Sequence, residues 1–183
     1  MLMKVRKLKK LMQTEFDEGE SLSAIYEKYG NKDIKEARLA YLVGTLKSKE
    51  LIAKYKTGRA VLVIIMVLVT LLSALYGYGI GLTSGSSTPV YWSAIAIIPL
   101  LFLYGFIRNS FQVYLAYIIL SITQLPRSMV NFGENLVIDV ISLLISVSII
   151  AFVWYLKNKL FPYMAMMGPK KSKEGVYLFV GSN

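Results

Sequence analysis

The sequence predicts an all-α, polytopic membrane protein, a bundle of four transmembrane helices with a small N-terminal cytoplasmic helical head. Three observations support this fold class. Residues 60–107 form a run of 48 residues without a charged side chain, enough for two bilayer crossings of about 20 residues each. Residues 136–156 form a second apolar run that contains one charge. The first 59 residues contain 14 of the 21 Lys and Arg, so a basic region precedes the apolar one.

Composition excludes several classes of function. The 183 residues are 55% hydrophobic, which leaves room for a membrane bundle and a small soluble part but not for a large enzyme domain. The chain contains no Cys, so disulfides and thiolate chemistry are excluded. It also contains no His, the commonest metal ligand and general base near neutral pH. We therefore expect no catalytic residue, no metal site and no cofactor.

Residues 1–58 are predicted to form the cytoplasmic head, which begins with a basic amphipathic helix. Its apolar residues recur at helical spacing: Val5, Leu8, Met12 and Phe16. Its basic residues are Arg6, Lys7, Lys9 and Lys10. Two interpretations stay open with equal weight. The apolar stripe lies on an anionic membrane surface, or it packs against the rest of the head.

Three further helices are expected in the remainder of the head. Ser21 and Gly30 bound a helix over residues 22–29, and Asp33 begins a longer one that ends near residue 47. Ser48 begins the last, over residues 49–55. The residues expected on the packed side of the longer helix are Ile34, Ala37, Tyr41 and Val43. The two helices around residue 30 resemble a helix-turn-helix only superficially, and eight acidic residues reduce the net charge of the head to +6, so nucleic acid is not an expected partner.

The first two spans are predicted over residues 60–80 and 90–107, within a membrane bundle that extends over residues 59–157. Pro99 lies inside the second span, where a membrane helix tolerates a kink because neighbouring groups satisfy the freed carbonyl. Small residues at four-residue spacing, Ser73, Gly77 and Gly81, permit close helix approach in the first span. We favour packing within the bundle over homodimerisation for this stripe.

The third and fourth spans are predicted over residues 110–125 and 136–156. The third span is short and polar, so the evidence that it crosses the membrane is the distribution of Lys and Arg along the chain. With four spans both termini are cytoplasmic, and 20 of the 21 basic residues lie inside, which leaves only Arg127 outside. With three spans the C-terminal lysines would lie outside, against the positive-inside rule. We expect a bacterial cytoplasmic membrane, and a tight hairpin at residues 108–110.

Residues 158–183 are predicted to be a basic cytoplasmic tail. Lys170 and Lys171 are expected to favour anionic lipid headgroups. Residues 161–169 are apolar and contain two prolines, so they are expected along the inner interface or against the head. The residues 175–180 have the composition of a strand, but the sequence indicates no partner for them.

Polar residues form one stripe on each of the last two spans. On the third span they recur at intervals of 4, 3, 4 and 3: Ser110, Tyr114, Tyr117, Ser121 and Gln124. On the fourth they recur at intervals of 4, 3 and 4: Asn135, Asp139, Ser142 and Ser146. These intervals place each set on one helix face. Because the helices are antiparallel, the two faces are expected to meet at matching depth.

Asp139 is the one charged residue within the fourth span, and it has two interpretations. In the first, it is an ion or proton site that faces a cavity. In the second, it forms a salt bridge to Arg127, supported by Gln124 and Asn135. We favour the bridge because Asp139 lies only about one helical turn, roughly 5–6 Å, inside the span.

These observations favour a non-catalytic protein. We expect an accessory, regulatory or immunity-type binding protein, with the lipid bilayer as its environment and a protein in the membrane, or a second copy of the chain, as its partner. The alternative is a small oligomeric ion channel or transporter that uses the polar face around Asp139. No repeated pair of broken helices, the usual indicator of a midplane substrate site, supports transport.

Overall fold

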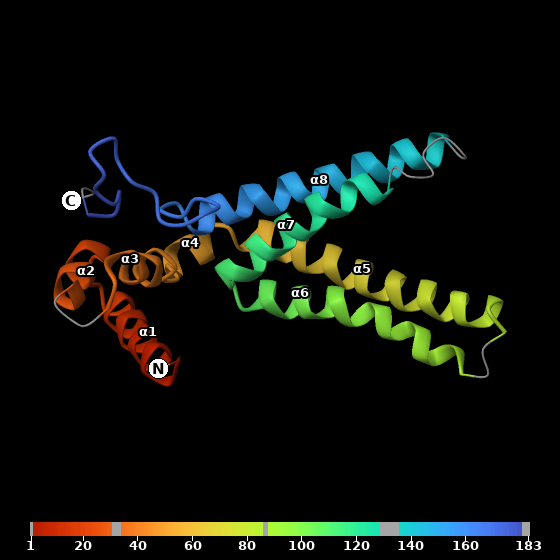
Figure 1. Cartoon of the computed structure of the whole chain (residues 1–183), viewed down its shortest axis with the longest axis horizontal. Coiled ribbons are helices and arrows are strands. Elements are labelled where there is room, and N and C mark those ends of the chain that lie inside the picture. Colours follow the sequence, from red (N-terminus) through yellow and green to blue (C-terminus); the bar gives the residue numbers. More distant parts are fainter. Residues whose placement is uncertain (1, 31–33, 86–87, 129–135, 181–183) are drawn as a thin grey trace. The chain divides into compact units, whose positions relative to one another are not determined.

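The protein is all-helical, as predicted, with 77% of it in helices (Figure 1). The computed structural model describes residues 2–30, 34–85, 88–128 and 136–180, with the side chains of 2–4 and 127–128 left out. The chain divides into two compact units. The terminal unit contains Met1–Tyr55 and Lys157–Asn183, and the central unit contains Lys56–Leu156.

Four helices form the first part of the terminal unit: α1 (Leu2–Asp17), α2 (Leu22–Gly30), α3 (Glu36–Gly44) and α4 (Lys49–Lys54). Two of the expected caps are present. The Ser21 hydroxyl accepts a hydrogen bond from the Ala24 N–H at 3.1 Å, and the Ser48 hydroxyl accepts one from the Leu51 N–H at 3.2 Å. Each cap satisfies a backbone donor that the first turn of its helix leaves unpaired.

The longer helix predicted to end near residue 47 ends at Gly44 instead. The Lys47 N–H, which would continue the helix, donates to the Gln13 side chain at 2.9 Å. The expected packed side is correct in part, because Val43 is buried and Ile34 is partly buried against the core, whereas Ala37 is exposed. Leu39, Ala40 and Leu42 are also buried. Asp33, the predicted cap, lies outside the described residues.

The apolar stripe of α1 packs into the core of the terminal unit. Met12 is 0% exposed, and Val5, Leu8 and Phe16 are partly buried against the same cluster. This is the second of the two interpretations, packing within the head. The apolar side of α1 is therefore covered by protein rather than presented to a membrane surface.

The last described residues of the chain complete this core. Tyr177 is 5% exposed and Phe179 is 1% exposed, and both belong to the cluster formed by α1, α2 and α3. The Tyr26 ring meets their rings edge-on, at centroid distances of 5.8 and 5.4 Å. Within the described part of the chain, residues 175–180 take part in one isolated bridge, between Lys171 and Tyr177. Despite their strand-like composition, these residues form an irregular segment whose apolar side chains pack into the core.

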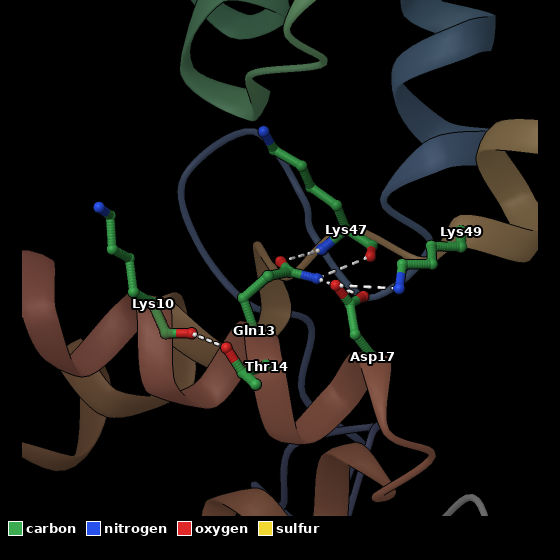
Figure 2. A network of polar contacts seen from close by, with 6 residues as sticks. All are labelled: Lys10, Gln13, Thr14, Asp17, Lys47 and Lys49. Atoms are coloured by element: carbon green, nitrogen blue, oxygen red, sulfur yellow. Dashed lines mark hydrogen bonds and ion pairs between the residues drawn. The ribbon is translucent and has the colours of Figure 1, made fainter.

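Gln13 joins α1 to the segment that links α3 and α4 (Figure 2). Its amide nitrogen donates to the Lys47 carbonyl at 3.0 Å, and its amide oxygen accepts the Lys47 N–H at 2.9 Å. The same amide nitrogen donates to Asp17 at 3.0 Å, and Lys49 pairs with Asp17 at 3.3 Å. One side chain thus satisfies both backbone groups of a residue outside any helix.

The central unit contains α5 (Lys56–Thr83), the 3₁₀ helix η1 (Pro89–Ala96), α6 (Ile97–Ile107), α7 (Phe111–Ser128) and most of α8 (Leu136–Leu160). Three stretches of the described chain are long and apolar enough to cross a membrane: Lys56–Thr83, Pro89–Ile107 and Leu136–Leu160. The predicted third span forms a shorter apolar helix over Phe111–Pro126. Membrane integration is thus supported by length and composition, with three qualifying helices rather than four.

Helix α5 and η1 run side by side at very short range (Figure 1). A Cβ atom on Gly77 would overlap the Trp92 carbonyl oxygen, and one on Gly81 would lie 2.6 Å from the Pro89 Cα. The Ser93 hydroxyl donates to the Ala74 carbonyl of α5 at 3.1 Å. Glycine at both positions therefore lets two backbones approach closely.

The turn between α6 and α7 is a tight turn of three residues, 108–110, as predicted. The Ser110 N–H donates to the Gly105 carbonyl at 3.1 Å and the Asn109 N–H to the Phe106 carbonyl at 3.0 Å, the pattern of a Schellman motif. Asn109 occupies its left-handed position with φ 48°. The Asn109 side chain accepts from the Arg59 Nε at 2.5 Å, which ties this turn to α5.

Candidate functional site

The candidate site is a groove of about 450 Å³ lined by the four helices α5, α6, α7 and α8 of the central unit. We call it the bundle groove. Its described lining residues are Met66, Val69 and Ser73 of α5, Ile98, Pro99 and Phe102 of α6, Tyr117, Leu120, Ser121, Gln124 and Leu125 of α7, and Ile145, Ser146, Ile149 and Ile150 of α8. The volume lies within the range of small-molecule and side-chain pockets. None of these described lining residues is charged.

A row of hydrogen-bonding side chains on α7 runs along the groove. Tyr117, Ser121 and Gln124 follow each other at intervals of four and three residues and therefore share one helix face. Ser146 of α8 and Ser73 of α5 line the same groove. The structure thus brings together three residues of the third-span stripe and one residue, Ser146, of the fourth-span stripe.

The side chains in this row differ in their hydrogen-bond partners. The Ser121 side chain is a hydrogen-bond partner of Tyr117. The Ser146 hydroxyl donates to the Ser142 carbonyl of its own helix at 2.8 Å. The Gln124 amide makes no hydrogen bond to any other residue that the structure describes. A Gln side chain has two N–H donors and a carbonyl acceptor, so Gln124 adds hydrogen-bonding groups to the lining of the groove.

An aromatic cluster between α6 and α7 forms the wall behind Tyr117. The Tyr117 ring meets Phe102 edge-on at 5.3 Å and Phe106 at 5.5 Å. Phe106 also meets Tyr114 at 4.8 Å, and Tyr114 is fully buried. Such edge-to-face pairs hold their partners in fixed orientations. Tyr114 thus belongs to the packing of the bundle, whereas Tyr117 reaches the groove.

Asp139 lies in the first turn of α8, half-buried, and does not line the bundle groove. Ser142 is exposed one turn further along the helix. The side chain of Arg127 and the whole of Asn135 lie outside the described residues, so the proposed bridge to Asp139 stays a prediction. Within the described chain, no group of three or more acidic side chains is placed to hold a metal ion.

The basic residues predicted to meet a membrane surface differ in their exposure and in their contacts. Arg6, Lys7 and Lys10 are exposed on α1. Lys9 is half-buried and its ammonium group donates to the Thr45 hydroxyl at 2.7 Å. Burial, with a smaller contribution from the neighbouring Lys47, lowers the pKa of Lys9 to about 8.

The two lysines of the tail also differ from each other. The Lys170 ammonium group donates to the Pro162 carbonyl at 2.7 Å. Lys171 is exposed and lies over the Tyr177 ring, 4.7 Å from its centroid. Both therefore contribute to the fold of the C-terminal segment.

The small-residue stripe of α5 has two parts. Gly77 and Gly81 face η1 within the same chain, and Ser73 lines the bundle groove. Sequence reasoning did not identify Thr45 and Lys47 beside Lys9, or Arg59 beside Asn109. An Asn between two apolar helices signals a left-handed turn residue, but nothing in the sequence pairs it with Arg59.

No family model, curated protein or solved structure matches the chain significantly, so its function has to be argued from its own residues.

Proposed function

We propose that this is a non-catalytic integral membrane protein that acts as an accessory, regulatory or immunity-type binding protein and receives a membrane partner in the bundle groove. The single observation that supports this proposal is the composition of the groove. It combines an apolar wall from four helices with the uncharged row Tyr117, Ser121 and Gln124. A transmembrane helix with hydrogen-bonding side chains fits such a surface, because interhelical hydrogen bonds and close packing drive association in lipid.

The same observation bears on the alternative function. A cation path is usually marked by charged side chains or carbonyl rings along the pore. The described lining of the bundle groove has neither, and Asp139 lies outside it. The groove therefore supports binding of an uncharged partner surface better than it supports ion conduction.

The proposal includes a topology of four crossings with both termini in the cytoplasm. The 18 residues of α7 extend over about 27 Å as an α-helix, close to the roughly 30 Å of the hydrocarbon core. The distribution of Lys and Arg favours this even number of crossings in a bacterial cytoplasmic membrane.

Reporter fusions test this topology. We expect a reporter active only in the cytoplasm to function at both termini, and one active only outside to function when inserted after residue 86. An external C-terminus with a cytoplasmic N-terminus would contradict four crossings and would leave α7 on one side of the membrane.

Site-specific photo-crosslinking tests the groove as the binding surface. A photoreactive side chain at Ser121 in native membranes is expected to form one discrete protein adduct. Gln112 is the matched control, because it is exposed on the opposite face of α7, nine residues or about 180° before Ser121. Adding Gln124→Leu is expected to weaken the Ser121 adduct, since it removes the amide that the partner would bind.

Identical adducts from both faces would contradict the groove as the binding surface. Ion flux through vesicles that contain the purified protein, abolished by Asp139→Asn, would instead favour the channel alternative.

A further inference from the structure

A short hairpin, which we call the tail hairpin, follows α8 in the terminal unit. The Lys170 N–H donates to the Tyr163 carbonyl at 2.8 Å, and the Ala165 N–H donates to the Gly168 carbonyl at 2.8 Å. These two bonds join the arms of the hairpin. The chain therefore reverses at the two methionines between Ala165 and Gly168, which form the tip.

The base of the tail hairpin is fixed on the core of the terminal unit. Met164 is 0% exposed, and a Cβ atom on Gly44 of α3 would lie 2.7 Å from the Met164 sulfur atom. Tyr163 packs against the core cluster, where its ring meets Phe179 edge-on at a centroid distance of 6.2 Å. Because close-packed side chains have few alternative positions, the base holds the hairpin in one place on this unit.

The tip of the tail hairpin is apolar and exposed. The Met167 side chain is fully exposed, and Met166 is partly exposed. Residues 160–169 contain no charged side chain. A single exposed apolar residue is ordinary on a protein surface. The position of this tip distinguishes it, because Met167 follows the end of α8 by only seven residues, and α8 is long and apolar enough to cross a membrane.

Three basic residues follow the tip: Lys170, Lys171 and Lys173. Residues 157–183 contain one acidic residue, Glu174, so this part of the chain is strongly basic. Lys171 and Lys173 are exposed. Lys170 donates one of its three ammonium N–H groups to the Pro162 carbonyl at 2.7 Å. That bond keeps a positive charge at the base of the hairpin.

The spacing between the tip and these lysines matches the layers of a membrane surface. Lys170 follows Met167 by three residues, which is at most about 10 Å along an extended chain. The polar headgroup layer is roughly 5–8 Å thick on each side of the hydrocarbon core. The tip can therefore reach the edge of the hydrocarbon while the ammonium groups stay at the level of the lipid phosphates.

We propose that the tail hairpin inserts into the bilayer leaflet at which α8 ends. Met166 and Met167 enter the apolar edge of that leaflet, and Lys170, Lys171 and Lys173 bind the phosphates of anionic lipid headgroups. Burial of apolar side chains and attraction to anionic lipid act together in interfacial anchors of this kind. The proposal requires that α8 crosses the bilayer, but it depends neither on the bundle groove nor on the number of crossings.

A single labelled cysteine tests the position of the tip, because the chain contains no other Cys. Met167→Cys in the full-length protein is labelled with a polarity-sensitive fluorophore and placed in nanodiscs of phosphatidylcholine and phosphatidylglycerol. We expect blue-shifted emission, strong quenching by nitroxide groups on the lipid acyl chains and weak quenching by acrylamide in the water. Glu27→Cys, an exposed position on α2 of the same unit, is the control and is expected to show the reverse.

A charge added at the tip tests the apolar contribution, with the label kept at residue 167. Met166→Asp is expected to move the label into water. Val176→Asp is the matched control, because it adds the same charge at an exposed apolar residue outside the hairpin, and it is expected to leave the label inserted. Hydrogen exchange of the Lys170 amide, which bonds Tyr163, is expected to stay slow in both variants and shows that the hairpin is retained.

Removing two lysines tests the contribution of the headgroups. Lys171→Gln combined with Lys173→Gln is expected to lower the ratio of inserted to free label about 25-fold, since each basic residue near an anionic surface contributes about fivefold. Lys35→Gln combined with Arg38→Gln is the matched control, because it removes the same charge from exposed positions at the start of α3.

The proposal is overturned if acrylamide quenches the label at Met167 as strongly as the label at Glu27, or if Met166→Asp and Val176→Asp give the same result. Equal insertion in the two double variants would overturn the assignment of the lysines to lipid phosphates. No residue of the bundle groove is changed in these experiments, so this proposal and the proposed function can fail separately.

Discussion

Replacing Phe179 by alanine is expected to unfold or loosen the terminal unit while the central unit keeps its helices. Phe179 is 1% exposed and packs with Tyr26, Tyr163 and Tyr177 at centroid distances of 5.4, 6.2 and 5.7 Å. Truncating a buried aromatic side chain to alanine costs about 3–5 kcal/mol. That loss is a large part of the roughly 5–15 kcal/mol that typically stabilises a domain. The measurement is hydrogen exchange of α1, α2 and α3 in the full-length protein in detergent.

Leu178→Ala is the control for this prediction. Leu178 is the neighbouring residue, but its side chain is 41% exposed. Because it lies outside the core cluster, its truncation is expected to change stability by less than about 0.5 kcal/mol. Equal protection of α1–α3 in wild type, Phe179→Ala and Leu178→Ala would show that the C-terminal segment does not hold the terminal unit together.

This C-terminal segment shows where sequence reasoning reaches its limit. Helical periodicity identified α1, and the caps Ser21 and Ser48 set the starts of α2 and α4, because both signals depend on residues close in the chain. The place of Phe179 in the core depends on contacts with residues far earlier in the chain, on α1, α2 and α3. In an irregular segment the apolar residues have no regular spacing, so the sequence does not indicate which of them are buried.

The bundle groove was partly predictable for a similar reason. The intervals between Tyr117, Ser121 and Gln124 place them on one face of α7, and the sequence alone shows this. The residue that each face meets is set by the turns and by the angles between helices. Thus Asp139, the most conspicuous polar residue of α8 in the sequence, lies outside the groove, whereas Ser146 lines it.

Gly77→Ala is expected to destabilise the packing of α5 against η1 more than any other single methyl addition in α5. The new Cβ would overlap the Trp92 carbonyl oxygen and lie 2.8 Å from the Trp92 carbonyl carbon. Both are backbone atoms, so neither can rotate away as a side chain would. Overpacking of this kind costs about 1–3 kcal/mol or more. Unfolding in detergent, followed by the fluorescence of Trp92 in a Trp154→Phe background, measures the loss.

Gly79→Ala separates this steric effect from the general consequence of replacing a glycine. Gly79 lies two residues further along the same helix, and a Cβ added there would have no heavy atom of the described chain within 4 Å beyond its own helix backbone. Alanine is the better helix former by about 1 kcal/mol, so this variant is expected to be neutral or slightly more stable. The two substitutions add the same methyl group and differ only in what it meets. A destabilisation shared by both would mean that helix α5 tolerates no alanine here for reasons other than η1, and that the close approach at Trp92 is not what requires Gly77.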